Sequence, residues 1–179
     1  WVVQGLHDKK QPYWKAADVR RYAYWNVFAG AAGHTYGHNS IMQFYDNLSE
    51  EGAFGARYLW SDAVHHPGGA QMIHPKRLMQ SVDFTHGRPA EDYLLEERGE
   101  KYDYISVFAG EDFLFAYTYT GRTISLSLEH YQGKKLGAYW LDPVTGLQTF
   151  ICDVTGRMQM EFRPPEREDG TDAVLVIRT

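Results

Sequence analysis

The stretch that decides the fold of the first half of this chain is DVRRYAYWNVFAGAAGHTYGHN, residues 18–39. Small apolar side chains recur every fourth position along its first part, at Val19, Ala23 and Val27. This spacing predicts a helix over residues 16–31 that ends at the glycines near position 30. We interpret the small and aromatic residues that follow, 32–39, as a short buried strand opening into a loop.

The remainder of the first half predicts a long irregular stretch and then a second helix. Residues 40–58 contain two glycines and no helical or strand period. Residues 67–82 read as a helix, with a kink or break at Pro75. The order helix, strand, loop, helix is the repeating unit of a (β/α)8 barrel, and it fits a doubly wound α/β sheet equally well.

The second half predicts an all-β fold. Aromatic and alternating apolar runs recur at spacings of about ten residues, which is typical of a small antiparallel sandwich. Residues 142–146, Asp-Pro-Val-Thr-Gly, have the composition of a hairpin loop. We therefore divide the chain into an α/β part (1–84), a polar linker or surface loop (85–100) and a β-sandwich (101–179).

Composition excludes several classes of protein. The 179 residues carry a net charge of −5, which argues against a nucleic-acid partner. A single cysteine excludes a disulfide framework, and no apolar run approaches the roughly 20 residues of a membrane helix. Because the chain begins at Trp1 without an initiator Met, we expect a piece of a longer protein.

The segment His34-Thr35-Tyr36-Gly37-His38-Asn39 holds the main candidate site residues. In a barrel, the carboxyl ends of the strands line the active site, and alternate strand residues point to the same side. Imidazole, phenol and amide groups suit a polyhydroxylated ligand. We expect His34, Tyr36, His38 and Asn39 to contact a carbohydrate, with Trp60 as a further wall of the cleft. The alternative is a satisfied polar core or turn.

Metal, cofactor and nucleophile signals are weak. The eight histidines include no H-E-x-x-H pattern, so we expect neither a metal nor a cofactor. Cys152 lies in an apolar strand pattern, typical of a buried small side chain. A glycosidase needs two carboxylates at a defined separation, and only Asp46 qualifies as a candidate. No catalytic pair is visible in this chain.

The run from Asp18 to Asn39 resembles the apiosidase-like glycoside hydrolases of bacteria that degrade plant polysaccharides. Residues 67–72 and 78–79 are similar to the last barrel helix of that family. The second half resembles the small β-domain that follows such barrels, labelled "putative collagen-binding domain of a collagenase". The residues that carry this part are Gly121-Arg122, the run 138–146 and Val174-Leu175-Val176-Ile177.

The resemblance implies the C-terminal portion of a (β/α)8 barrel followed by a small antiparallel β-sandwich. Both catalytic carboxylates are then expected before Trp1, so that this chain alone is inactive. The missing N-terminal barrel portion would be a partner, present in the same protein or as a separate chain. We expect a bacterial protein that is secreted, periplasmic or at the cell surface. Met42 and Pro75 depart from the family pattern.

Three hypotheses follow for the function. The chain is part of a glycoside hydrolase and supplies the strand-8 side of the cleft. Alternatively, the β-domain is a non-catalytic module that binds carbohydrate or protein. In the third, the β-domain only caps the barrel and holds its last helix. We favour the first and third together.

Overall fold

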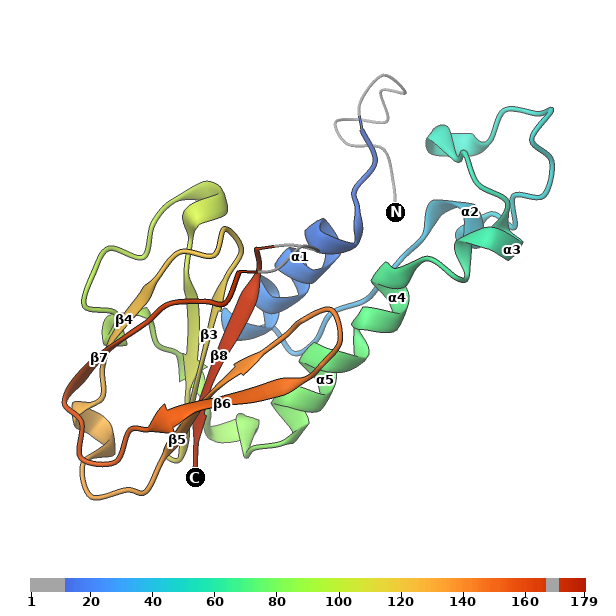
Figure 1. Cartoon of the computed structure of the whole chain (residues 1–179). Coiled ribbons are helices and arrows are strands. Elements are labelled where there is room, and N and C mark those ends of the chain that lie inside the picture. Colours follow the sequence, from blue (N-terminus) through green and yellow to red (C-terminus); the bar gives the residue numbers. More distant parts are fainter. Residues whose placement is uncertain (1–11, 167–170) are drawn as a thin grey trace.

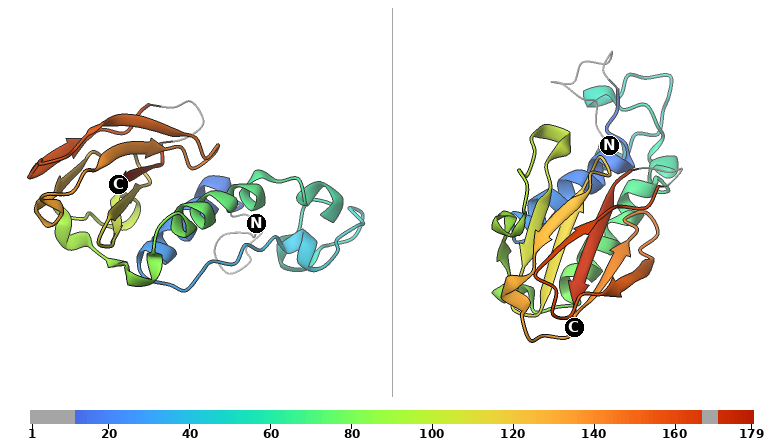
Figure 2. Two further views of the ribbon diagram at one scale, coloured as in Figure 1. Left: turned by 90° about the horizontal axis from the view of Figure 1, so that it is seen from below. Right: turned by 60° about the vertical axis from the view of Figure 1, so that its left-hand side comes forward.

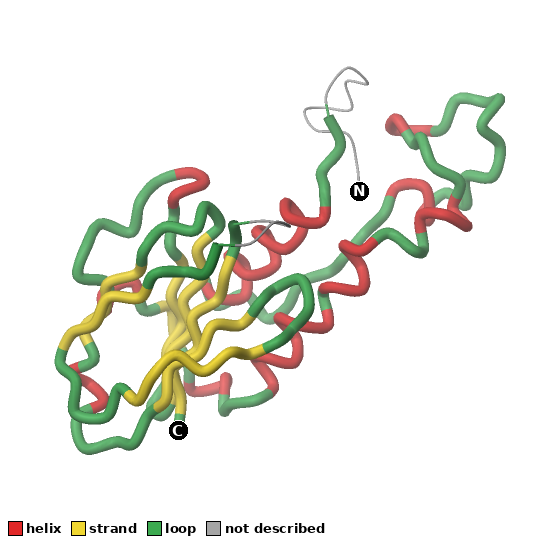
Figure 3. The backbone as a smooth tube through the Cα atoms, viewed as in Figure 1, coloured by secondary structure: helices red, strands yellow, loops and turns green. Residues whose placement is uncertain are grey.

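The computed structural model describes residues 12–166 and 171–179, in which a helical part precedes a β-rich part (Figures 1 and 3). The α-helices are α1 (Ala16–Phe28), α2 (Asn39–Met42), α3 (Trp60–Ala63), α4 (Pro67–Gln71) and α5 (Ile73–Gln80). The strands are β1 (Arg88–Pro89), β2 (Ser106–Ala109), β3 (Phe113–Thr118), β4 (Ile124–Ser127), β5 (Gly137–Leu141), β6 (Gln148–Asp153), β7 (Gln159–Phe162) and β8 (Ala173–Arg178).

Helix α1 forms where the apolar spacing predicts it. At its start, the Asp18 carboxylate accepts a hydrogen bond from the backbone N–H of Lys15 at 2.8 Å, which satisfies an amide that has no helical partner. At its end, Gly30 adopts φ +90°, a conformation that glycine reaches without strain. The buried face includes Tyr24 and Phe28, one turn apart.

The strand expected over residues 32–39 is not formed within the described chain. Residues 31–38 run as an extended link between α1 and α2, and no strand of the described chain pairs with them. An extended segment becomes a strand only through hydrogen bonds to a neighbour. Most of this link is exposed, whereas His38 at its end is buried. The helix–strand–helix unit is therefore present as two helical segments joined by extended chain.

The second predicted helix is divided, as Pro75 suggested. α4 ends at Gln71 and α5 begins at Ile73, so the break falls at Met72, three residues before the proline. Pro75 has no N–H to donate to the carbonyl of Gln71, four residues earlier, and its ring crowds that carbonyl. The two segments follow one another along the same line in Figure 1.

The β-rich part contains a six-stranded antiparallel sheet in the order β1-β2-β3-β8-β5-β6 and a two-stranded sheet, β4-β7. The two sheets enclose an apolar core to which β3 and β8 contribute every second residue. Its fully buried members include Val107, Leu114, Ile124, Leu126, Leu175 and Ile177. The antiparallel sandwich predicted from the turn spacing is present.

The other face of the large sheet is covered by helices rather than by solvent. The alternate residues of β3, Phe113, Phe115 and Tyr117, form a second core with Tyr24 and Phe28 of α1. Leu78 of α5 belongs to the same cluster. Figure 2 shows α1 and α5 lying against the sheet, with residues 31–66 extending away from it. Because both faces are buried, the β3 sequence Phe-Leu-Phe-Ala-Tyr-Thr is almost continuously apolar.

Part of the predicted linker or surface loop belongs to the β-rich half. Strand β1 pairs with β2 at the edge of the sheet, with Pro89 opposite Phe108. Ala90 and Tyr93 are buried in the sandwich core. Residues from 88 onward therefore pack as part of the β-fold, and the domain boundary at residue 84 stays a prediction.

Candidate functional site

His38 is the most buried of the predicted site residues, with 2% of its surface exposed. It is the N-cap of α2, and its Nδ1 accepts a hydrogen bond from the backbone N–H of Ser40 at 3.2 Å. An accepting Nδ1 carries no proton, so the proton of the neutral ring is on Nε2. Burial, together with the neighbouring His66, lowers the pKa of His38 to about 4, so the ring is neutral near pH 7.

His66 lies beside His38, although 28 positions separate them in the sequence. The Nε2 of His38 and the Nδ1 of His66 are 2.9 Å apart, within hydrogen-bonding distance. Tyr58 meets the His66 ring edge-on at a centroid distance of 4.8 Å. Burial also lowers the pKa of His66. The link before α2 and the loop before α4 thus join at a cluster of two imidazoles and a phenol.

Asn39 is buried, and its amide is engaged by the protein itself. Its side-chain nitrogen donates to the backbone carbonyls of Ala53 and Phe54, at 2.9 and 3.0 Å. Its side-chain oxygen accepts a hydrogen bond from Gln43 at 3.0 Å. These bonds hold the turn at Ala53–Gly55 against the start of α2. Asn39 therefore fixes the loop that follows His38.

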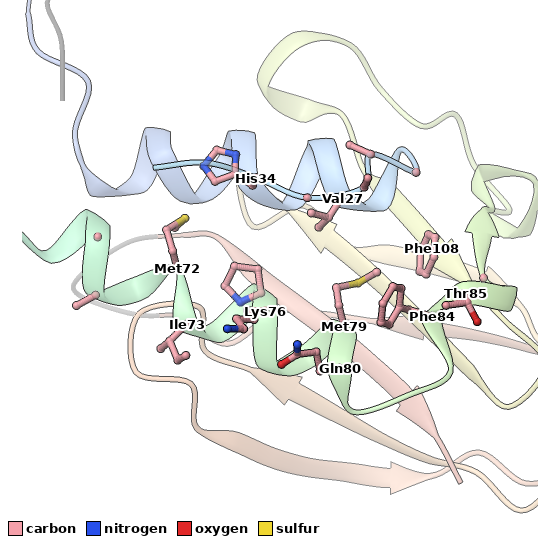
Figure 4. Close-up of a pocket in the computed structure, with 18 residues that line it drawn as sticks. Val27, His34, Met72, Ile73, Lys76, Met79, Gln80, Phe84, Thr85 and Phe108 are labelled. Carbon is pink, nitrogen blue, oxygen red and sulfur yellow. The ribbon is translucent and has the colours of Figure 1, made fainter. Parts of the chain in front are cut away.

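His34 and Tyr36 lie on the extended link and line cavities. His34 borders an elongated cavity of about 890 Å³ between α1 and α5, shown in Figure 4, in which Lys76 is the main charged group. Its apolar lining includes Val27, Met72, Ile73, Met79, Phe84 and Phe108. A smaller cavity of about 180 Å³ contacts both His34 and Tyr36. Burial lowers the pKa of His34.

Trp60 is exposed at the start of α3, and its ring contact is with Phe44 rather than with the histidines. The two rings meet at a centroid distance of 6.0 Å and an angle of 71°. The backbone N–H of Trp60 donates to the carbonyl of Tyr45 at 2.7 Å. The role of the Trp60 side chain as a wall of a sugar cleft stays a prediction.

The part of the chain that the structure describes holds no group of three or more metal-binding side chains. Asp46, the one carboxylate candidate, is exposed in the irregular stretch after α2. Trp1 and His7 lie outside the described residues. The two catalytic carboxylates are expected before Trp1, and the structure therefore does not describe them.

Among the described helices, none combines the length and apolarity that crossing a bilayer requires.

A buried ion pair connects the helical part to the β-rich part. The Arg20 guanidinium donates to both carboxylate oxygens of Asp172, at 2.8 and 2.9 Å. Its third nitrogen donates to the side-chain oxygen of Gln71 in α4 at 2.7 Å. The Tyr117 hydroxyl reaches Asp172 at 3.3 Å, and the Tyr117 ring stacks on Tyr24 at 4.8 Å. One guanidinium therefore ties α1, α4 and the start of β8 together.

Comparison with known families assigns both halves of the chain. Residues 2–86 match the model described as "Apiosidase-like, catalytic domain", and residues 89–178 match "Putative collagen-binding domain of a collagenase". Residues 2–86 thus belong to the apiosidase-like family. No curated protein matches it.

Solved structures agree with this family. A protein named "Glycoside hydrolase" superposes on 99% of the chain with a TM-score of 0.91 and 39% identity. A glycoside hydrolase family 5 structure from Bacteroides vulgatus ATCC 8482 superposes on 99% of it, with a TM-score of 0.90 and 36% identity. The chain spans 40% and 38% of the lengths of these two proteins.

His66, like Tyr58, belongs to this cluster although the sequence did not single it out. It is the N-cap of α4 and precedes Pro67, which stands at the first helical position. A polar residue followed by proline is a recognisable helix start. The sequence gives no signal that pairs this position with His38, because the contact depends on how residues 43–59 fold.

Proposed function

We propose that the chain is the C-terminal portion of a (β/α)8-barrel glycoside hydrolase that acts on plant or other complex polysaccharide. In this proposal, residues 31–38 are the eighth barrel strand, with α1 before it and α4–α5 after it. The strand is completed when neighbouring strands lie beside it, and both catalytic carboxylates are supplied by the preceding barrel portion. The observation that carries the proposal is the superposition on 40% of a glycoside hydrolase at 39% identity.

The site geometry supports the proposed role of residues 34–39. His38 ends the extended link, where the carboxyl end of a barrel strand faces the active site. His38 and its neighbour His66 form a hydrogen-bonded pair that carries no charge at pH 7, which suits a neutral sugar. His34, Tyr36 and Trp60 remain proposed sugar contacts, and Asn39 orders the adjoining loop.

The β-domain is proposed to cap the barrel and hold its last helices. Support comes from the shared core of Tyr24, Phe28 and Phe115 and from the Arg20–Asp172 ion pair.

The second candidate function, in which the β-domain is an independent binding module, receives less support. Tyr117 and Tyr131, two large aromatic side chains of the β-rich part, are buried in packing and not presented to a ligand. An extracellular bacterial location belongs to the same proposal, because polysaccharides are too large to enter a cell intact.

A chimera tests the proposal. The part of the solved glycoside hydrolase that the chain superposes on is replaced by residues 1–179, so that the remaining portion supplies the carboxylates. The chimera is assayed on pectic polysaccharide and on a panel of chromogenic glycosides, with an apioside included because of the family name. The proposal predicts turnover by the chimera and none by the 179-residue chain alone. A folded chimera without turnover on any substrate of the parent enzyme would contradict it.

A further inference from the structure

The ring contact between Phe44 and Trp60 lies on the surface of the molecule. Phe44 is 70% exposed and Trp60 is 39% exposed, and the two rings stand at a steep angle to each other. They form an open aromatic corner after α2. Single exposed apolar side chains are common on proteins, so exposure alone does not indicate a function. The backbone that holds this pair gives the stronger signal.

Phe44 has a left-handed backbone, with φ 48°. This conformation is unfavourable for a residue that carries a Cβ, whereas glycine adopts it without that cost. Packing of the side chain could offset the cost, but most of the Phe44 side chain is in water. Strained residues of this kind cluster at active sites and ligand-binding sites.

Gln43, the residue before Phe44, is fixed by its side chain. Its Nε2 donates to the backbone carbonyls of Asn39 and Ala53, at 3.2 and 3.0 Å. Its Oε1 accepts a hydrogen bond from the backbone N–H of Ala53 at 2.9 Å. The Gln43 amide therefore bridges the start of α2 and the turn that begins at Ala53.

Tyr45, the residue after Phe44, is fixed through its backbone. Its N–H donates to the carbonyl of Ser40 at 2.9 Å, and its carbonyl accepts from the N–H of Trp60 at 2.7 Å. The second bond brings the start of α3 beside Phe44. Because both neighbours of Phe44 are held, the corner is formed before any ligand arrives, which lowers the cost of binding.

The chemistry of this corner suits an uncharged sugar. A sugar ring has hydroxyls at its edge and C–H groups on its faces, and an aromatic ring packs against such an apolar face. The charged residues nearest to Phe44 and Trp60 along the chain are Asp46 and Asp62, both acidic. Carboxylates accept hydrogen bonds from sugar hydroxyls and repel a sugar that carries a negative charge.

We propose that Phe44 and Trp60 form a sugar-binding subsite, in which one ring stacks on the face of a neutral sugar unit and the other bounds its edge. This inference rests on the proposed function. It adds Phe44, which the sequence did not indicate, and gives Trp60 a partner in its predicted role. α2 begins directly after His38 and ends two residues before Phe44. The subsite therefore lies beyond the carboxyl end of the proposed strand, where the active site of a barrel opens.

The first test is independent of turnover. The 179-residue chain is labelled with 5-fluorotryptophan and titrated with cello-, xylo- and galacturono-oligosaccharides, and fluorine-19 NMR follows the Trp60 signal, assigned by its loss in Trp60→Phe. We expect this signal to shift with at least one of the two neutral series and not with the acidic one. The signal of Trp140, a buried tryptophan, should stay in place.

Phe44→Gly should abolish the Trp60 shift. The proposal is overturned if neither neutral series shifts the Trp60 signal, or if Phe44→Gly shows the same shift as the wild type. It is also overturned if the acidic series produces a response as large as the neutral ones.

The second test uses the chimera and the substrate on which it is most active. Phe44→Gly removes the ring and also relieves the left-handed backbone. It should raise KM about tenfold, the loss of roughly one aromatic contact, while the urea midpoint stays the same or rises. Trp60→Phe, which keeps an aromatic ring, should raise KM less than Trp60→Ala does. Phe150→Ala is the matched control, because Phe150 is a similarly exposed phenylalanine on β6, and it should leave KM unchanged.

A lower urea midpoint in Phe44→Gly would show that the preceding barrel portion packs on this ring, and would overturn the proposal. An unchanged KM in Phe44→Gly, or an equal rise in Phe150→Ala, would overturn it as well. An inactive parent chimera would count against the proposed function, while the fluorine NMR result still decides the assignment of Phe44 and Trp60.

Discussion

Arg20 and Asp172, 152 positions apart, form an ion pair with two hydrogen bonds in which both side chains are almost completely buried. The pair joins α1 to Asp172, the residue immediately before β8. Removing one partner from a buried pair leaves the other charge uncompensated, which costs far more than the pair itself contributes. The relationship explains how a helix early in the chain is fixed to a strand at its end.

Asp172→Asn should therefore lower the free energy of unfolding by about 3–5 kcal/mol, measured by urea denaturation. Asp92→Asn is the matched control, because Asp92 also accepts two hydrogen bonds from one guanidinium, that of Arg88, but on the surface. That variant should lose less than about 1 kcal/mol. Equal losses in the two variants would show that burial of the Arg20 pair is unimportant.

The hairpin between β5 and β6 offers a second prediction. Gly146 has φ +76°, and a side chain there would meet the His74 ring, whose Nε2 lies 3.1 Å from the carbonyl of Val144. Gly156 has φ +72° with open space around it. Gly156→Ala should cost about 1 kcal/mol for the left-handed backbone alone. Gly146→Ala should cost about 1 kcal/mol more, because the hairpin must also release α5. Thermal unfolding of both variants measures the difference.

The buried imidazole of His38 predicts how stability depends on pH. Its pKa is about 4 in the folded chain, against about 6.5 in an unfolded one. Between these values the unfolded state binds more protons, so the free energy of unfolding is highest above pH 6.5 and falls as the pH drops toward 4. We expect His38 to account for roughly 3 kcal/mol of that fall.

Urea denaturation of the wild type and of His38→Asn at a series of pH values from 4 to 7 checks this prediction. The variant should show a shallower decline than the wild type. His65→Asn, at an exposed position, is the control and should follow the wild type. Parallel curves for the wild type and His38→Asn would show that His38 is not the group responsible.

Local signals were sufficient for most of the elements. The Asp142–Gly146 run is a hairpin loop, in which the Asp142 carboxylate accepts from the N–H of Val144 at 2.8 Å and from the Thr145 hydroxyl at 2.7 Å. The helix over Ala16–Phe28 and the break before Pro75 also follow from near neighbours in sequence. In each case the residues that determine the structure lie within a few positions of it.

Features that depend on distant partners could not be predicted. Residues 32–39 have strand-like composition, but pairing needs neighbouring strands, and none lies beside them in the described chain. The contact of His38 with His66 depends on the course of the loop between them. Nothing near Asp172 in the sequence indicates a partner in the first helix, because a buried ion pair has no periodic pattern.

A crystal structure of the chimera, soaked with oligosaccharides released from the polysaccharide that it degrades, tests the proposed sugar cleft most directly. We predict sugar density within hydrogen-bonding distance of at least one residue from 34 to 39, at the end of an eighth barrel strand formed by residues 31–38. Sugar bound in the chimera without contact to any residue between 34 and 66 would contradict it.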